Sequence, residues 1–274
     1  MPLFRMKRWS HTLSKRLLQF GVLAALAASF LIFYRANYEV PILMYHRVDD
    51  FAERSSIMVS SETFERQMEF LKVHHYNVLP LSDILACIKS GKKLPPKSVS
   101  ITFDDGYLDN IKNAFPVLRK MGFPATVFMI TSNIGKENWL SAEDLRILDE
   151  AGVSIGSHTA NHAFLPSLDS AAVEAELKVS KKNLEDVLGH PATLFSYPAG
   201  GFTPRVRSLV EGAGYEGAVT TNHGKDKHDP YALHRVKITE AKGNLFNFWA
   251  KTSGMYQTGK KRAQASDMRK GSPG

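Results

Sequence analysis

The chain has 274 residues, 43% of them hydrophobic, which is enough for one large domain or two small ones. Its formal net charge of +8 arises mostly from lysines and arginines crowded near the two ends. A nucleic-acid-binding domain spreads such residues across one folded face, so we expect no nucleic-acid partner. Cys87 is the only cysteine, which excludes an intrachain disulfide and a thiolate metal cage.

An apolar segment begins near the N-terminus and runs from Leu17 to Tyr34 without a charged residue. At ~1.5 Å per residue it spans roughly 27 Å, enough to cross a bilayer core. Because basic residues precede it, we predict a cytoplasmic segment at 1–16 and a single-pass signal anchor at 17–34. The remainder is then exported to the periplasmic or extracellular side. A cleavable signal peptide is the alternative, since 25–27 reads Ala-Leu-Ala, although the apolar run continues beyond it.

Beyond the anchor, predicted strands and helices alternate along a domain at 35–258, which a basic flexible tail at 259–274 follows. The predicted strands are 40–45, 78–79, 98–103, 124–130, 153–156, 194–197, 218–221 and 233–238. The predicted helices are 61–75, 83–89, 108–121, 141–151, 170–188, 205–211 and 245–252. Alternation predicts a parallel α/β sheet. Polar residues follow the strand ends, which favours a (β/α) barrel over an open sheet.

Two polar clusters follow strands of this predicted barrel. Asp104 and Asp105 come directly after strand 98–103, and His158 and His162 follow strand 153–156. Aspartate with two histidines is a ligand set for a first-row divalent ion that keeps positions open for water and substrate. Zn²⁺ is the default, and Co²⁺, Ni²⁺ or Fe²⁺ also fit. Such an ion lowers the pKa of bound water and polarises a carbonyl oxygen, so an unligated Asp104 would act as general base.

These motifs resemble those of the polysaccharide deacetylases, the NodB-homology or carbohydrate esterase 4 family. The resemblance covers roughly 41–238 and rests on three pieces, namely Thr-Phe-Asp-Asp-Gly at 102–106, the histidine pair, and Tyr-Pro-Ala-Gly at 197–200. It implies a distorted NodB-type (β/α) barrel that follows one transmembrane helix. It also implies that Asp105, His158 and His162 hold the metal and that Asp104 activates water against an N-acetyl carbonyl.

The third motif departs from the family pattern. Ser196 stands where the family usually has an arginine, so the sequence assigns no arginine to orient Asp104. Ala199 replaces the usual aromatic residue, but its backbone N–H can still donate to a developing oxyanion. We also predict that Tyr107 and the rest of the turn contact the substrate. The predicted substrate-binding residues are therefore Tyr107, Tyr197, Pro198 and Gly200.

Two histidines compete to protonate the leaving amine. His46 ends the first strand and resembles a feature of the exported biofilm-polysaccharide deacetylases. His234 lies in Leu-His-Arg at 233–235. This is the nearest match to the family's late leucine-x-histidine motif, but its histidine is displaced by one residue. Both remain candidates.

Together the motifs predict a membrane-anchored, metal-dependent hydrolase that removes N-acetyl groups from a GlcNAc-containing polysaccharide. Its partners are then an acetylated glycan and the membrane, while protein partners stay unknown. Two alternatives remain open. An O-acetyl esterase would use the same metal site without a strong acid, and a non-catalytic glycan-binding barrel would keep the fold but not the turnover.

Overall fold

The computed structural model describes residues 6–50, 56–221, 228–240 and 244–256, without the side chains of 6–14 and 36–37. The chain divides between Glu39 and Val40 into two units, which we describe separately. The predicted tail at 259–274 and the first five residues of the predicted N-terminal segment lie outside the described residues.

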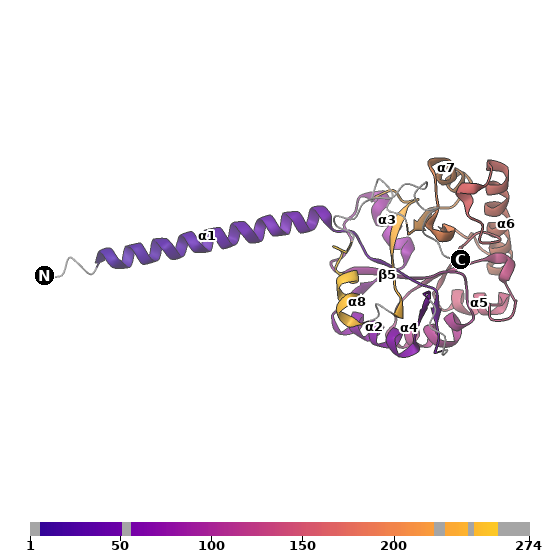
Figure 1. The fold of residues 1–274 in the computed structure, drawn as a ribbon, viewed down its shortest axis with the longest axis horizontal. Coiled ribbons are helices and arrows are strands. Elements are labelled where there is room, and N and C mark those ends of the chain that lie inside the picture. Colours follow the sequence, from indigo (N-terminus) through magenta and orange to yellow (C-terminus); the bar gives the residue numbers. More distant parts are fainter. Residues whose placement is uncertain (1–5, 51–55, 222–227, 241–243, 257–274) are drawn as a thin grey trace. The chain divides into compact units, whose positions relative to one another are not determined.

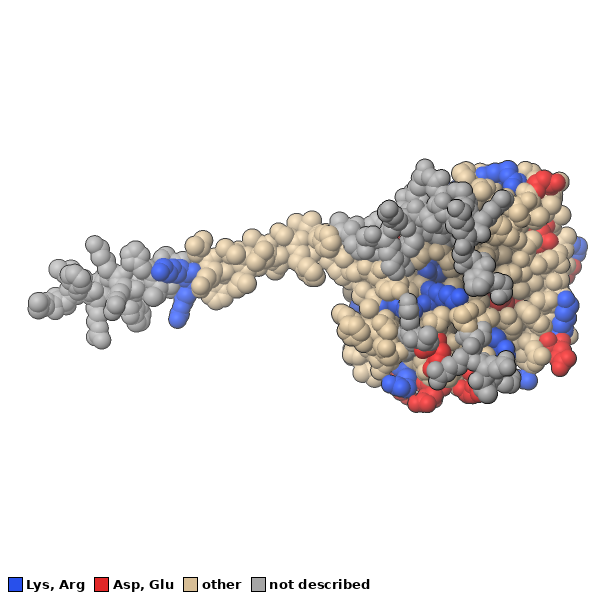
Figure 2. Space-filling view, in the orientation of Figure 1, with Lys and Arg blue, Asp and Glu red and all other residues tan. Residues whose placement is uncertain are grey.

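The first unit contains one long helix, α1 (Met6–Asn37). Within it, Lys15–Arg35 is long and apolar enough to cross a membrane, a criterion that a signal sequence near an N-terminus also meets. Figure 2 shows basic residues at the beginning of this stretch and uncharged residues after them. The predicted span at 17–34 therefore falls inside one continuous helix.

The second unit is a closed barrel of seven parallel strands with helices around it (Figure 1). Closure comes from β1 (Ile42–Tyr45), which pairs with β5 (Ser98–Phe103) on one side and with β10 (Leu233–Lys237) on the other. Between them lie β6 (Thr126–Met129), β7 (Ser154–Ser157), β8 (Leu194–Ser196) and β9 (Gly217–Thr220). The predicted (β/α) barrel is confirmed.

Three short strands lie outside the ring. The strand β4 (Asn77–Val78) adds to β5, while β2 (Arg47–Val48) and β3 (Met58–Val59) pair with each other. The helices of this unit are α2 (Ser61–Val73), α3 (Leu81–Ser90), α4 (Phe115–Met121), α5 (Ala142–Glu150), α6 (Ser170–Leu188), α7 (Pro204–Gly212) and α8 (Leu245–Thr252).

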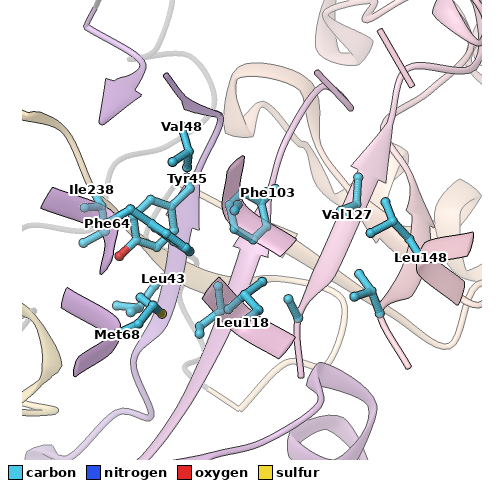
Figure 3. Close-up of a cluster of buried hydrophobic side chains, with 14 of the residues drawn as sticks. Leu43, Tyr45, Val48, Phe64, Met68, Phe103, Leu118, Val127, Leu148 and Ile238 are labelled. Carbon is cyan, nitrogen blue, oxygen red and sulfur yellow. The ribbon is translucent and has the colours of Figure 1, made fainter. Parts of the chain in front are cut away.

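Side-chain alternation along the strands builds two apolar layers. Residues such as Leu43, Tyr45 and Phe103 point outward, where they pack against Phe64 of α2 (Figure 3). Tyr45 and Phe103 stack with ring centroids 5.6 Å apart, and Phe64 meets Tyr45 edge-on at 5.2 Å. Burying rings of this size dominates core energetics. The outer layer thus holds the strands in register and fixes where their C-terminal ends lie.

The inner layer fills the barrel. Ile42, Phe128 and Leu233 belong to one buried cluster, to which Leu81 and Leu85 of α3 also contribute. Inward positions nearer the strand C-terminal ends are polar instead. This change from apolar to polar residues along one barrel interior creates the candidate site.

The predicted helix at 108–121 is only partly α-helical. Its first part is a π-helix, Asn110–Ala114, and α4 begins at Phe115. Pro116 has no N–H and its ring crowds the carbonyl one turn earlier, so the wider turn relieves a clash. In this arrangement Asn110 and Asn113 donate side-chain hydrogen bonds to the carbonyls of His46 and Val48 at 2.8 and 2.7 Å. The irregular turn therefore ties the chain after β1 to the chain after β5.

Candidate active site

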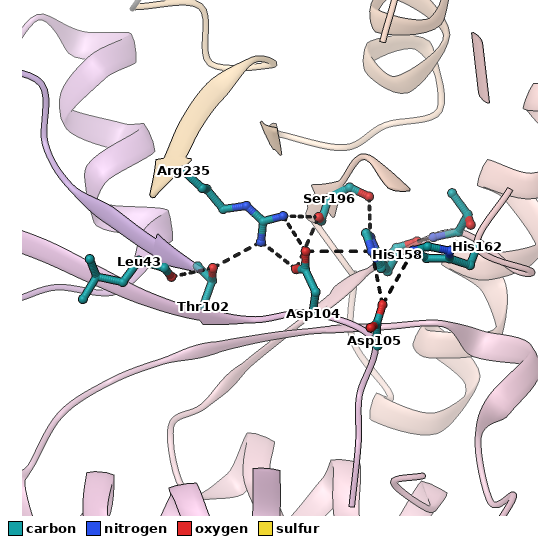
Figure 4. A network of polar contacts seen from close by, with 10 residues as sticks. Leu43, Thr102, Asp104, Asp105, His158, His162, Ser196 and Arg235 are labelled. Carbon is teal, nitrogen blue, oxygen red and sulfur yellow. Dashed lines mark hydrogen bonds and ion pairs between the residues drawn. The ribbon is translucent and has the colours of Figure 1, made fainter. Parts of the chain in front are cut away.

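Polar side chains from four non-adjacent parts of the sequence meet at the C-terminal end of the barrel (Figure 4). Asp104 and Asp105 follow β5, and His158 and His162 follow β7. Ser196 ends β8, and Arg235 lies on β10. Parallel strands bring their carboxyl ends to one edge, which is where barrels of this class build their sites.

Asp105, His158 and His162 form the predicted cation site. One donor atom from each lies within 4.8 Å of the others. Asp105 Oδ1 is 3.5 Å from His158 Nε2 and 3.7 Å from His162 Nε2. These separations are too long for hydrogen bonds, yet they suit donors that share an ion ~2.0–2.2 Å from each. The three side chains therefore fit a divalent metal ion.

A hydrogen bond on the side of the ring away from Asp105 sets the orientation of His158. Its Nδ1 lies 2.8 Å from the carbonyl oxygen of Ser196, and a carbonyl can only accept, so Nδ1 carries the proton. The other ring nitrogen, Nε2, then has a free lone pair directed at Asp105. Metal-binding histidines commonly have their second nitrogen held in this way.

The loops that carry these ligands adopt left-handed backbone conformations. Asp105 has φ +73°, and Thr159 and His162 have φ +66° and +56°. Non-glycine residues rarely adopt such values, and strained positions of this kind cluster at functional sites. Gly106 is also required, because a Cβ there would lie 2.0 Å from the sulfur of Met129. The turn after β5 is thus built to direct the Asp105 carboxylate toward the histidines.

The protonation states also suit cation binding. Burial lowers the pKa of His158 against the opposing charges of Asp104 and Asp105, and burial likewise lowers the pKa of His162. Both imidazoles are therefore neutral near pH 7. Burial raises the pKa of Asp105 to about 6, with His158 opposing the rise, so its carboxyl is mainly ionised there. Neutral imidazoles and a carboxylate are the forms that ligate metals.

Asp104 is held by an arginine that sequence analysis did not identify. Arg235 Nη1 donates to Asp104 Oδ1 at 2.6 Å and Nη2 donates to Oδ2 at 2.5 Å, while both side chains are almost fully buried. Burial alone would raise the pKa of Asp104, but the charge and hydrogen bonds of Arg235 hold it well below its usual range, with His158 contributing. A buried, ionised Asp104 therefore faces the metal site without belonging to it.

Arg235 itself is fixed by further contacts inside the barrel. Nη1 lies 3.2 Å from Thr102 Oγ1, Nη2 donates to Ser196 Oγ at 2.9 Å, and the guanidinium lies over the ring of Phe128. Ser196, which stands where the family usually has an arginine, thus contacts an arginine from a different strand. The signal in the sequence was strand alternation, since Arg235 is in phase with the buried Leu233.

His46 lies beside this group and His234 does not join it. His46 is half-buried after β1, and the burial of its ring lowers its pKa to about 4 against the opposing charge of Asp104. Its Nδ1 makes no hydrogen bond with any described residue. His234 is adjacent to Arg235 on β10, and successive side chains of a strand point to opposite faces. With Arg235 directed inward, His234 faces away from the site.

The turn after β8 differs from what the sequence predicts. Tyr197 is fully buried and donates to the carbonyl of Tyr231 at 3.0 Å, so its predicted contact with substrate is not supported. Pro198 and Gly200 are buried as well. Ala199 is exposed and has φ +52°. Within the described residues no backbone hydrogen bond is recorded from its N–H.

Tyr107 is also placed differently. Burial and the charge of the neighbouring Asp105 carboxylate raise the pKa of Tyr107 to about 12. Its ring stacks on Trp139 with centroids 4.6 Å apart, and the Arg47 guanidinium lies 5.1 Å from the ring centroid. A ring covered in this way has little surface left for a sugar, so the predicted substrate contact of Tyr107 is not supported either.

Comparison with known proteins agrees with this geometry. The family profile described as polysaccharide deacetylase matches residues 91–218. The Bacillus subtilis protein YxkH, named as a polysaccharide deacetylase, is 36% identical over 203 residues, covering 73% of this chain and 72% of its own. A poly-β-1,6-N-acetyl-D-glucosamine N-deacetylase of Staphylococcus aureus is 29% identical over 209 residues, covering 69% and 70%.

A solved structure gives the same result. The crystal structure of a polysaccharide deacetylase from Bacillus anthracis matches with a TM-score of 0.68 at 33% identity, covering 78% of this chain and 69% of its own. The resemblance that the motifs predicted is therefore confirmed over most of the chain. The chain belongs to the polysaccharide deacetylase family, whose members hydrolyse N-acetyl amide bonds of polysaccharides.

Proposed function

We propose that the protein removes acetyl groups from N-acetylglucosamine units of an exported polysaccharide, with a divalent metal ion held by Asp105, His158 and His162. The observation that carries the proposal is the convergence of these three donors beside an ionised, unligated Asp104. The similarity to a poly-β-1,6-N-acetyl-D-glucosamine N-deacetylase supports the choice of sugar. Zn²⁺ is the ion that this ligand set fits best, and Co²⁺, Ni²⁺ or Fe²⁺ remain alternatives.

A divalent ion held by Asp105, His158 and His162 would supply Lewis acidity toward the acetyl carbonyl and the attacking water. Asp104 accepts the proton of the attacking water as the new C–O bond forms. Arg235 keeps that carboxylate ionised and fixes both of its oxygens. The backbone N–H of Ala199 is the donor that we assign to the oxyanion. The amide C–N bond then breaks, which releases acetate and a glucosamine unit.

We assign protonation of the leaving nitrogen to His46. Its position beside Asp104 and its unpartnered Nδ1 support this choice over His234, which faces away. Because its pKa is lowered to about 4, His46 is neutral near pH 7, so the proton that it donates is the one that Asp104 has accepted from the attacking water. The variant His46→Gln is expected to lower kcat for N-acetylated oligosaccharide by about 10²-fold. His234→Gln, the matched control, should leave kcat near the wild-type value. The reverse ranking in initial rates of acetate release would move the role to His234.

The proposal is tested by acetate release from full-length protein extracted from membranes. Acetylated β-1,6-linked glucosamine oligosaccharides are the substrate. Treatment with a chelator is expected to abolish acetate release, because Asp105, His158 and His162 cannot polarise the acetyl carbonyl without an ion. Addition of Zn²⁺ should restore acetate release. Persistence of activity after complete metal removal would contradict the proposed site.

We also propose that Lys15–Arg35 is an uncleaved anchor, so the intact mass of this preparation should include residues 1–16.

The same assay separates the alternatives. Faster release from O-acetylated than from N-acetylated oligosaccharides would favour an esterase, which needs no strong acid for its leaving group. A metal-loaded protein that is inactive on both would favour a glycan-binding barrel. The departure from the family's third motif at Ser196 is the feature that favours such a barrel. It counts for less because Arg235 makes the contact with Asp104 that the absent arginine would make.

A further inference from the structure

We propose that Glu176 of α6 is a positioning residue that fixes the loop carrying His162. This inference rests on the proposed metal site and adds a residue outside it. The ring of His158 is buried and its Nδ1 lies 2.8 Å from the Ser196 carbonyl, whereas the His162 side chain is 44% exposed. Packing restrains His162 less, so the place of its ring depends on the backbone of the loop at 158–162.

The chain after β6 holds the first half of this loop. The N–H of Thr131 donates to the Thr159 carbonyl at 3.2 Å, and the N–H of Ser132 donates to the Ala160 carbonyl at 2.9 Å. From within the loop, Ser157 Oγ accepts a hydrogen bond from the Thr159 N–H at 3.2 Å. These contacts fix the backbone as far as residue 160, two positions before the second histidine.

The second half of the loop is held by the Glu176 side chain. The Asn161 N–H donates to Glu176 Oε2 at 2.9 Å, and Asn161 Nδ2 donates to Glu176 Oε1 at 2.7 Å. Both carboxylate oxygens therefore hold one residue, and that residue is the immediate neighbour of His162. Hydrogen bonds to an ionised group are roughly twice as strong as those between neutral groups. Glu176 is thus placed to fix the direction from which His162 enters the site.

The helix that carries Glu176 is itself joined to the segments around the loop. Ser180 Oγ accepts a hydrogen bond from Ser157 Oγ at 2.8 Å, and Asn183 Nδ2 donates to Thr131 Oγ1 at 3.2 Å. Glu176, Ser180 and Asn183 are spaced four and then three residues apart, so they lie on one face of α6. This face contacts both the histidine loop and the chain after β6, which gives Glu176 a fixed position.

The backbone conformation of His162 requires such support. Its φ is +56°, and non-glycine residues in this left-handed region persist only where surrounding contacts hold them. Without the two hydrogen bonds between Asn161 and Glu176, we expect the end of the loop to sample other conformations. Zn²⁺ binding would then also have to order the loop, and such ordering lowers affinity. The inference therefore predicts an effect of Glu176 on metal affinity, although its carboxylate is not a metal ligand.

The experiment compares the Zn²⁺ dissociation constants of full-length wild type and three variants, measured by competition with a chromophoric chelator. We expect Glu176→Ala to raise the Zn²⁺ dissociation constant about tenfold, which is the lower end of the usual effect of removing an outer-shell partner at a metal site. Glu176→Gln keeps one acceptor oxygen, so its dissociation constant should lie between those of wild type and Glu176→Ala.

Glu174→Ala is the matched control. Glu174 lies on the same helix and pairs with Lys178 at 3.0 Å, so its removal also deletes a carboxylate and an ion pair from α6. It leaves the contact between Glu176 and Asn161 in place. We therefore expect Glu174→Ala to bind Zn²⁺ with the wild-type dissociation constant. Circular dichroism of each variant shows that the barrel is folded under the conditions of the titration.

Equal Zn²⁺ affinity in wild type and Glu176→Ala would overturn the positioning role and leave the proposed function intact. A lower unfolding temperature of metal-free Glu176→Ala with unchanged Zn²⁺ affinity would do the same, because it would assign Glu176 to fold stability alone. An equal loss of affinity in Glu174→Ala would also overturn the role, since the effect would then come from the charge of α6. If wild type itself binds neither Zn²⁺ nor Co²⁺, the proposed metal site fails together with this inference.

Discussion

Replacing Asp104 with Asn is expected to lower kcat for N-acetylated oligosaccharide by about 10²–10⁴-fold, the usual contribution of a positioned general base. Asn keeps the shape of the side chain and its Oδ1 can still accept a hydrogen bond from one nitrogen of Arg235, but it cannot take a proton from water. Asp104 is not among the three donors of the metal site, so bound metal per protein should remain at the wild-type level. Initial rates of acetate release and elemental analysis of the same samples measure the two effects.

The informative control is Asp105→Asn, the neighbouring carboxylate. This variant should lose both activity and bound metal, because it removes one of the three donors. Activity of Asp104→Asn within about tenfold of wild type would show that another group accepts the proton, since a true base contributes more. Loss of metal from Asp104→Asn would instead show that both carboxylates bind the ion. Thermal unfolding of each variant checks that the Arg235 charge, left without its carboxylate, has not unfolded the barrel.

The sequence predicts those parts of the site that are local in the chain. Asp104, Asp105 and Gly106 are consecutive and follow a buried apolar run, so one strand with a sharp turn accounts for all three. His158 and His162 likewise follow a single strand. Because parallel strands of a barrel gather their ends, placing the two segments side by side needs only the prediction that both strands belong to one barrel.

Contacts that depend on pairing between distant strands could not be predicted in this way. Arg235 and Asp104 are 131 positions apart, and they meet because β1 pairs with both β5 and β10. That closure fixes which side chains of β10 point inward, and a shift of one residue would exchange Arg235 for His234. Judged by motif alone, His234 is the more prominent candidate. Judged by register, Arg235 is the residue that reaches the site.

The motifs also did not predict which of their side chains are exposed. Tyr197 belongs to a recognisable turn, yet its ring is packed between Phe195 and Phe202 and its hydroxyl holds the Tyr231 carbonyl. The motif at 197–200 therefore combines a residue that supports the turn with Ala199, which is exposed. Sequence places both in one motif, but only packing distinguishes the structural residue from the one that can contact a substrate.

Replacing Arg235 with Met is expected to destabilise the domain by ~3–5 kcal/mol, the typical cost of removing one partner of a buried ion pair. Asp104 is 4% exposed and would keep a carboxylate with no cation beside it. Urea unfolding of the full-length protein in detergent measures the free energy of unfolding. Arg235→Lys should recover only part of the loss, because a single ammonium cannot reproduce two parallel hydrogen bonds to both carboxylate oxygens.

The double variant Asp104→Asn with Arg235→Met shows whether the loss comes from the unpaired charge. With both charges removed, no uncompensated ion remains in the barrel, so the double variant should be more stable than Arg235→Met alone. If the losses in free energy of unfolding of Asp104→Asn and Arg235→Met add up in the double variant, the two residues are not coupled. Arg235 would then stabilise the barrel through packing on Phe128. A coupled pair would mean that the group which keeps the general base ionised also links β10 to the residue that follows β5. The ionised state of Asp104 and the stability of the closed barrel would then depend on the same two hydrogen bonds.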